Sequence, residues 1–138
     1  MRQFTKTLQI RTRGRGLYEF TNDVVACVDE QKFATGLLTL FCRHTSASLL
    51  IQENAAPAVR DDLESFFEAL APEHARYRHN DEGPDDMPSH LRAALTSVSL
   101  SIPIVGGELM LGVWQGVYLF EHRRVPHVRE VALNIVGA

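Results

Sequence analysis

Regular alternation of apolar and polar residues at both ends of the chain constrains its fold most strongly. Residues 3–11 and 129–136 each place an apolar side chain at nearly every second position. These apolar positions are Phe4, Leu8, Ile10, Val131, Leu133 and Ile135. A period of two residues is typical of a β-strand that buries one face. Both ends of the chain are therefore predicted to be half-buried strands.

Further strands are predicted between them. Residues 36–42 are apolar on both faces, which favours a central position in a sheet. The polar residues 43–46 interrupt this pattern before strand character resumes at 47–51. Near the C-terminus, the Gly106-Gly107 turn separates strands at 97–104 and 108–121, which predicts an antiparallel meander that continues into the last strand.

The clearest helix is predicted over residues 55–70, because its apolar residues recur on one helical face. Asn54 is expected to cap it and Pro72 to end it. Thr21 can cap a short earlier helix, and Asp86 or Met87 a later one with Pro88 in its first turn. The predicted fold is a single α+β domain over residues 1–138, a mostly antiparallel sheet or sandwich with two or three helices.

The composition narrows the possible partners. A net charge of −3 argues against a general nucleic-acid binder, because phosphate contacts need a surplus of basic residues. No apolar run approaches the roughly 20 residues that a membrane span requires. Cys27 and Cys42 lie in apolar surroundings, and no signal peptide precedes them, so a reduced, cytoplasmic protein is expected.

The stretch 79–90, HNDEGPDDMPSH, is the strongest candidate for chemistry. It combines two histidines and four acids in a segment too polar for a core. Imidazole and carboxylate are ligands for zinc, manganese and similar ions. Asp86 and His90 are four residues apart and can share a helical face, while His79 can fold over from the loop. The alternative is a solvated acidic loop in which Asp86 only caps a helix.

Two other segments offer possible partners for this stretch. His44 ends the central strand and is followed by the hydroxyl side chains of Thr45 and Ser46, although a lone histidine there is often structural. Gln115 alternates with Val113 and Val117 and is predicted to point inward. Trp114 can stack on a heterocycle or pack at a subunit interface. Glu121, Arg123 and Arg124 form a charged strand end that can bind an anion or stay solvated.

Three phrases together resemble one known family: HTSASL with ENAAPAVRDDLE, EGPDDMPSH, and LGVWQGVYLFEHR. They resemble the YjbQ family, also called the secondary thiamine-phosphate synthase family, along essentially the whole chain. The resemblance implies a homotrimer with one cleft lined by the shared motifs, and a thiamine-phosphate synthase side activity. That reaction joins an aminopyrimidine diphosphate to a thiazole phosphate and releases pyrophosphate. The stretch after Glu121 departs from the common pattern, which leaves Arg123 with less support as a phosphate ligand.

The resemblance also assigns roles to residues. A divalent ion, zinc or magnesium or manganese, would neutralise the leaving pyrophosphate. The expected metal ligands are His79, Asp86 and His90. The expected catalytic residues are His44, Glu53, His90 and Glu121. The expected substrate-binding residues are Thr45, Ser46, Asn54, Trp114, Gln115 and Arg123.

Three functional hypotheses fit these residues. The first is a metal-assisted transferase of the thiamine-phosphate synthase type that takes a small phosphorylated heterocycle. The second is a non-enzymatic trimer that binds a metal or a phosphorylated metabolite in the same cleft. The third is a metal-dependent hydrolase in which histidine and aspartate activate water.

Overall fold

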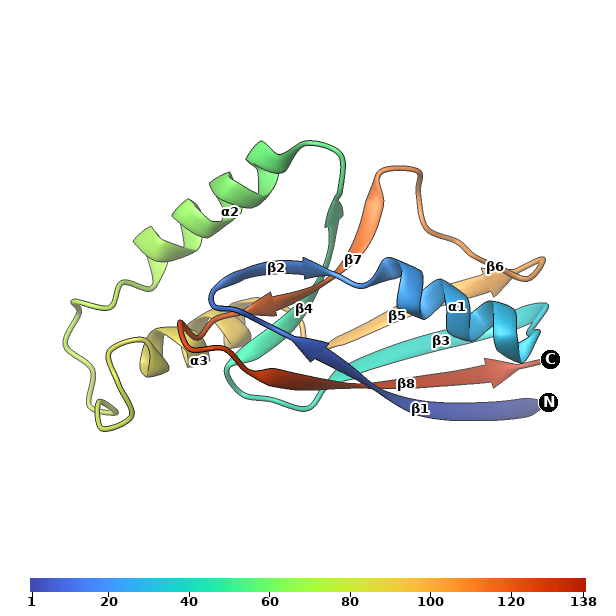
Figure 1. Ribbon diagram of the computed structural model, residues 1–138, viewed down its shortest axis with the longest axis horizontal. Coiled ribbons are helices and arrows are strands. Elements are labelled where there is room, and N and C mark those ends of the chain that lie inside the picture. The colour runs from blue at the N-terminus through green and yellow to red at the C-terminus, as the bar shows by residue number, and fades with distance from the viewer.

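The computed structural model describes residues 1–138 and contains two antiparallel sheets with three helices (Figure 1). The strands are β1 (Arg2–Arg11), β2 (Gly16–Glu19), β3 (Thr35–Cys42), β4 (Ala47–Glu53), β5 (Ser99–Val105), β6 (Glu108–Leu109), β7 (Gln115–Glu121) and β8 (Val128–Gly137). The helices are α1 (Thr21–Gln31), α2 (Pro57–Leu70) and α3 (Asp86–Leu95). The five-stranded sheet has the order β1-β8-β3-β5-β6 and the three-stranded sheet the order β2-β7-β4. The predicted α+β class is confirmed.

Side chains from both sheets and from α1 form one hydrophobic core of 18 buried residues. The alternation at the two ends of the chain supplies part of it, because β1 and β8 pair with each other along their whole length. In β8, Val131, Leu133 and Ile135 are fully buried. Burial of each such side chain stabilises the fold by roughly 1.5–3 kcal/mol. The two predicted terminal strands therefore lie side by side at the core.

Strand β3 occupies the centre of the five-stranded sheet, as its apolar character predicted. Only one of its faces is covered, however. Leu38 and Leu40 are completely buried, whereas Leu37 and Phe41 on the opposite face are 46% and 49% exposed. The chain thus leaves an apolar sheet face open to the outside.

The predicted C-terminal meander is wrong beyond its first hairpin. β5 and β6 pair across Gly106-Gly107 as expected. The predicted strand 108–121 breaks after Leu109, and β7 resumes at Gln115 in the other sheet. The side-chain Oε1 of Gln115 accepts a hydrogen bond from the Gly112 N–H at 2.7 Å, which closes a turn before β7. β8 then pairs with β1 and β3 rather than with β7.

The helices lie near their predicted positions, but their expected caps differ. α2 begins at Pro57 after Ala56, and the Asn54 amide donates instead to Glu19. Thr21 is the first residue of α1, and its hydroxyl accepts the N–H of Val117. Asp85 precedes α3, and Pro88 lies in the first turn as predicted. A proline in the first turn needs no cap for its own missing N–H. The side chains of Asn54 and Thr21 bond Glu19 and Val117 instead of capping their own helices.

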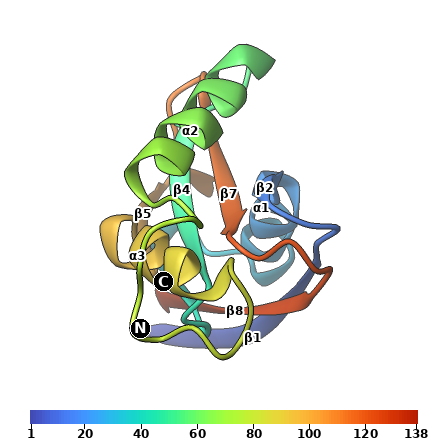
Figure 2. The ribbon, with the colours of Figure 1, turned by 90° about the vertical axis from the view of Figure 1, so that its left-hand side faces the viewer.

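The placement of α3 sets up the candidate site. α3 and the loop before it lie at the end of the molecule opposite both termini (Figure 1). Viewed from that end, α2 stands above α3, and the loop between them descends along one side (Figure 2). None of the three helices combines the length and apolar character needed to cross a membrane.

Candidate metal centre

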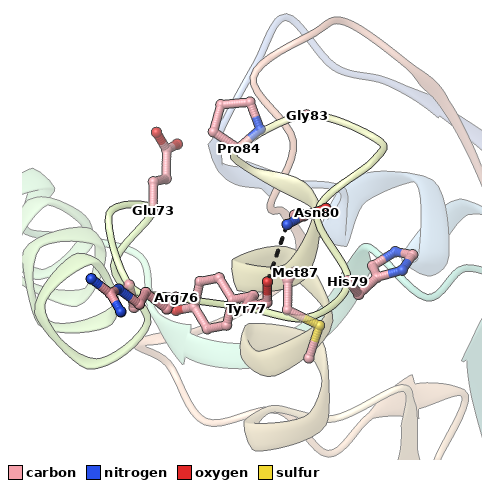
Figure 3. Close-up of a pocket in the computed structure, with 9 residues that line it drawn as sticks. Glu73, Arg76, Tyr77, His79, Asn80, Gly83, Pro84 and Met87 are labelled. Carbon is pink, nitrogen blue, oxygen red and sulfur yellow. Dashed lines mark hydrogen bonds between the residues drawn. The ribbon is translucent and has the colours of Figure 1, made fainter.

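The loop between α2 and α3 spans residues 71–85 and, together with Met87 of α3, lines an open cavity of about 430 Å³ (Figure 3). Two hydrogen bonds within the loop shape it. The Tyr77 hydroxyl donates to the Pro72 carbonyl at 2.7 Å, and the Asn80 amide donates to the Tyr77 carbonyl at 3.4 Å. His79 forms part of the cavity wall and carries its ring to the start of α3. The segment between α2 and α3 is therefore a loop held by hydrogen bonds beside an open cavity.

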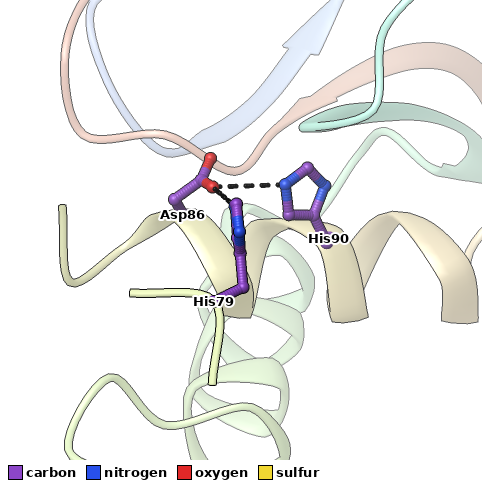
Figure 4. A group of neighbouring side chains, drawn as sticks. All are labelled: His79, Asp86 and His90. Atoms are coloured by element: carbon purple, nitrogen blue, oxygen red, sulfur yellow. Dashed lines mark hydrogen bonds and ion pairs between the residues drawn. The ribbon is translucent and has the colours of Figure 1, made fainter. Parts of the chain in front are cut away.

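His79, Asp86 and His90 meet where this loop crosses α3 (Figure 4). Asp86 Oδ2 lies 2.7 Å from His79 Nε2 and 3.2 Å from His90 Nε2. Asp86 and His90 share a face because one helical turn separates them. One nitrogen or oxygen from each of the three residues lies within 4.8 Å of the others, a spacing that can hold a metal ion. The structure thus brings together the three residues predicted as metal ligands.

The hydrogen bond at the other nitrogen of His90 defines its tautomer. His90 Nδ1 lies 3.0 Å from the Thr45 carbonyl oxygen, which can only accept, so Nδ1 carries the hydrogen. In a neutral His90 the Nε2 lone pair then faces the Asp86 carboxylate, and two acceptors would repel each other. A positive ion between them, either a proton on the ring or a metal, makes the contact favourable. Histidine ligands of metals are usually oriented in this way.

Asp86 is buried, and its other oxygen is held by Arg123. Arg123 Nη1 donates to Asp86 Oδ1 at 2.7 Å, Nε donates to Asp85 Oδ2 at 3.0 Å, and Nη2 donates to the Glu82 carbonyl at 2.9 Å. Burial alone would raise the pKa of Asp86, but the hydrogen bond from His79 and the charges of His90 and Arg123 lower it. Asp86 is therefore an anion with one oxygen, Oδ2, left for the histidines or a metal.

The exposure of the three side chains leaves room for a further ligand. The side chain of Asp86 is 5% exposed, whereas those of His79 and His90 are 43% and 31% exposed. The hydrogen bond to Asp86 also raises the pKa of His79. Two imidazoles and a carboxylate with an open side match sites where a metal keeps a position for water or substrate. These residues fit zinc or a similar divalent ion.

His44 and Ser46 lie in the turn between β3 and β4, and Glu121 is the last residue of β7. Their polar atoms serve the fold. His44 Nε2 accepts the N–H of Glu130 at 2.7 Å, and burial lowers the pKa of its ring. Ser46 Oγ accepts from Arg129 at 3.0 Å. Glu121 is fully buried and binds Arg129 as well as the hydroxyl of Thr12. Thr45 contributes its carbonyl to His90, and its side chain has no bonding partner.

The remaining predicted residues lie at the other end of the same strand pair. In the register of β4 with β7, Ala47 faces Glu121 at one end and Glu53 faces Gln115 at the other. Six residue steps separate the two ends, roughly 20 Å at the rise of a strand. Asn54 and Trp114 lie with Glu53 at the far end, joined by a backbone hydrogen bond. Within one chain the predicted residues therefore do not form a single cleft.

The predicted inward orientation of Gln115 is wrong. Gln115 is exposed, because β7 begins there and its side chain folds back to Gly112. Trp114 is 62% exposed. The alternation of Val113, Gln115 and Val117 predicts a continuous strand, but the chain turns between Gly112 and Gln115.

Several residues of the site were missed from the sequence. Asp85 accepts a hydrogen bond from Arg123, which also binds Asp86, and the Arg124 N–H donates to Asp85 at 2.9 Å. Arg76, Tyr77 and Met87 line the cavity beside His79. Two adjacent aspartates at the start of a helix could have identified Asp85 from the sequence. The cavity residues could not be identified in this way, because only the folding of the loop brings them together.

Comparison with known proteins is consistent along the whole chain. A family model described as UPF0047 protein YjbQ-like matches residues 6–138. UPF0047 protein sll1880 of Synechocystis sp. is 54% identical over 137 residues, which cover 99% of this chain and 93% of the relative. UPF0047 protein YjbQ of Escherichia coli O157:H7 is 40% identical over 135 residues, which cover 97% of this chain and 98% of the relative.

Two crystal structures share the fold. A conserved hypothetical protein from Thermus thermophilus superposes with a TM-score of 0.84 at 36% identity, and covers 95% of this chain and 99% of its own. A YjbQ/UPF0047 family protein from Clostridium acetobutylicum superposes with a TM-score of 0.83 at 32% identity, and covers 96% of this chain and 99% of its own. Sequence and fold therefore agree on the same set of relatives.

Proposed function

The chain belongs to the UPF0047 family of YjbQ-like proteins, and with that membership as the premise we propose that it is a metal-assisted transferase. The reaction is of the thiamine-phosphate synthase type. A ring nitrogen of a thiazole phosphate forms a C–N bond with the methylene carbon of an aminopyrimidine diphosphate. The C–O bond to the diphosphate breaks, and pyrophosphate leaves with the electron pair.

The observation that carries this proposal is the contact between His90 and Asp86. Because Thr45 fixes the hydrogen on Nδ1, His90 turns its Nε2 toward Asp86 Oδ2 at 3.2 Å. His79 approaches the same oxygen from the loop at 2.7 Å. A divalent ion held by these residues would act as a Lewis acid on the leaving pyrophosphate. His79, Asp86 and His90 orient that ion, and Arg123 keeps Asp86 in place.

The open apolar face supports the homotrimer that we propose as the assembled form. Leu37 and Phe41 lie on the uncovered side of β3, and Val98 and Val128 are also 36% and 45% exposed. Large exposed apolar patches mark interaction surfaces more often than free surface. Association would also allow residues at the Trp114 end of one chain to approach the metal centre of another. We place the protein in the cytoplasm, in keeping with its two free buried cysteines.

A second candidate, a non-enzymatic metal-binding or phosphometabolite-binding trimer, uses the same metal ligands. His44 and Glu121, the expected acid–base residues, are already engaged by Glu130 and Arg129. A binding module needs the metal centre but no proton carrier. The displacement written above also needs none, since the ring nitrogen attacks with its own lone pair. The transferase and the binding module would therefore use the same metal site, and only the transferase would release pyrophosphate.

The experiment measures pyrophosphate release by the metal-loaded protein. The transferase predicts release only when the aminopyrimidine diphosphate and the thiazole phosphate are both present. His90→Ala is expected to lose bound metal and this release together, because one of three ligands is gone. Release from the diphosphate alone would indicate a hydrolase instead. Metal binding without any release would leave the binding module as the function.

A further inference from the structure

The loop cavity shares a wall with the metal centre. His79 lines the cavity and also bonds Asp86 Oδ2. Met87, on the same wall, directly follows Asp86 in α3. Figure 3 shows Arg76 at one end of the lining side chains and His79 at the other, with Tyr77 and Met87 between them. A ligand in this hollow would therefore reach the metal centre at its His79 end.

The wall offers apolar surface and two polar groups without partners. Tyr77, Pro84 and Met87 provide a ring, a pyrrolidine and a thioether. Asn80 uses its amide nitrogen for the Tyr77 carbonyl, which leaves its oxygen without a donor. Arg76 makes no ion pair and no side-chain hydrogen bond. Its guanidinium group is thus free to bind an anion.

The one carboxylate on the wall does not cancel that charge. Glu73 Oε1 already binds Arg124 Nε at 2.6 Å and Arg15 Nη1 at 3.3 Å. Two cations hold this single anion. At the His79 end, Glu82 Oε2 lies 3.1 Å from Nε2 of His79 and Asp81 Oδ1 lies 3.7 Å from Nδ1. The attraction for negative charge is therefore centred on Arg76, at the opposite end of the cavity.

The loop that forms the cavity is fixed at several points. The Tyr77 hydroxyl binds the Pro72 carbonyl, Arg123 binds the Glu82 carbonyl, and His79 binds Asp86. A site formed before the ligand arrives avoids the entropic cost of ordering a loop on binding. At about 430 Å³ the hollow is within the range of small-molecule pockets.

We propose that this cavity binds the thiazole phosphate, or more generally a planar ring that carries a phosphate at one end; this assignment rests on the proposed transferase function. The phosphate pairs with Arg76, and the ring lies between Tyr77 and Met87. The reacting edge of the ring faces His79 and the metal centre, where the diphosphate of the second substrate binds. Arg76 and Tyr77 are then residues that determine which acceptor is used.

The test of the phosphate end compares two arginines of the same loop. Arg78 is exposed and unpaired like Arg76, but it does not line the cavity. Binding of thiazole phosphate to the full-length, metal-loaded protein is measured by calorimetry. Arg76→Ala is expected to weaken it about ten- to hundredfold, the effect of losing a hydrogen bond to a charged group. Arg78→Ala is expected to leave the affinity within about twofold of the original value.

The test of the ring end uses Tyr77. Tyr77→Phe keeps the ring and loses only the hydrogen bond to Pro72, whereas Tyr77→Leu removes the ring. Loss of the stacked ring is expected to weaken thiazole phosphate binding roughly tenfold. Binding of inorganic phosphate, which has no ring, should change equally little in both variants.

Two results would overturn the assignment. One is an equal loss of binding in Arg76→Ala and Arg78→Ala, or no loss in either. The other is an Arg76→Ala variant that releases pyrophosphate as fast as the wild type when thiazole phosphate is limiting. Binding that depends on Arg76 without any pyrophosphate release would leave the cavity assignment standing and refute the transferase reaction alone.

Discussion

Arg123 shows how one side chain can organise the whole candidate site. From the sequence it was a possible phosphate ligand at the end of a strand. In the structure its three nitrogens are taken by Asp85, Asp86 and the Glu82 carbonyl. Its planar fork fits two carboxylates and a carbonyl at once, which a lysine cannot do. Three of its five N–H donors are used in this way, so Arg123 positions Asp86, the central residue of the candidate metal site.

Replacing Arg123 with lysine tests this role, because the charge stays and the fork is lost. Arg123→Lys is expected to weaken divalent-ion binding about 10–100-fold, the usual effect of losing a partner of a metal ligand. Arg124→Lys is the matched control, since the Arg124 side chain binds Glu73 and only its backbone N–H reaches Asp85. Titration of both variants with Co²⁺, followed by its visible spectrum, gives affinity and ligand geometry together. Equal affinities would contradict the role assigned to Arg123.

His122 is a histidine of the interior rather than of the candidate metal site. Its side chain is buried, with 1% of its surface exposed. Burial and the nearby charges of Arg92 and Arg129 lower the pKa of His122 to about 3. Its Nε2 bonds Ser48 Oγ at 2.8 Å in the packed interior. His122 is neutral at physiological pH and belongs to the fold rather than to the metal centre.

Helix α2 is attached to the rest of the molecule by few contacts. The apolar spacing over 55–70 correctly identified a helix and its apolar face. Only Phe67 of that face is buried, against the ring of Phe120 at a centroid distance of 5.5 Å. The second attachment is an ion pair at 2.6 Å between Glu64 and the fully buried Arg92 of α3. Periodicity shows which residues share a face, but not whether the same chain covers that face.

The adjacent residues Phe66 and Phe67 provide a direct test of this attachment. Phe67→Ala is expected to lower the free energy of unfolding by about 3–5 kcal/mol, because it leaves a cavity against Phe120. Phe66 is 59% exposed in the single chain, so Phe66→Ala is expected to cost less than about 1 kcal/mol. Urea denaturation of dilute protein measures both values. A larger loss for Phe66 would mean that another chain covers that side of α2.

The sequence predicts individual strands better than it predicts which strands pair with each other. β3 was placed correctly at the centre because its own residues are apolar on both sides. The position of β7 in the second sheet depends on contacts with β2 and β4, distant in sequence, which a local pattern does not encode. The same limit applies to the site. Asp86 and His90 are linked by helical spacing, whereas the approach of Arg123 required the fold.

Over the whole molecule, the predicted site residues fall at two ends of the β4–β7 pair. The candidate metal centre lies at one end, while Glu53, Asn54 and Trp114 lie at the other. Leu37 and Phe41 are exposed on the outer face of β3, which points away from the core between the two sheets. A homotrimer that covers this face would reconcile the shared motifs with their separation in one chain. The candidate metal centre needs no second chain for its three ligands, since His79, Asp86 and His90 come from a single loop and helix.

The central claim, that His79, Asp86 and His90 hold a divalent ion, is tested most directly by titrating the purified, chelator-treated protein with Zn²⁺ and with Mn²⁺. We predict one ion per chain in the wild type and no measurable binding in Asp86→Asn, which keeps the size of the side chain and removes its charge. Asp62→Asn is the matched control, because Asp62 is exposed on α2 and belongs to neither group of residues that could hold an ion. It should bind like the wild type. A wild-type protein that binds neither ion, or an Asp86→Asn variant that binds as well as the wild type, would contradict the claim.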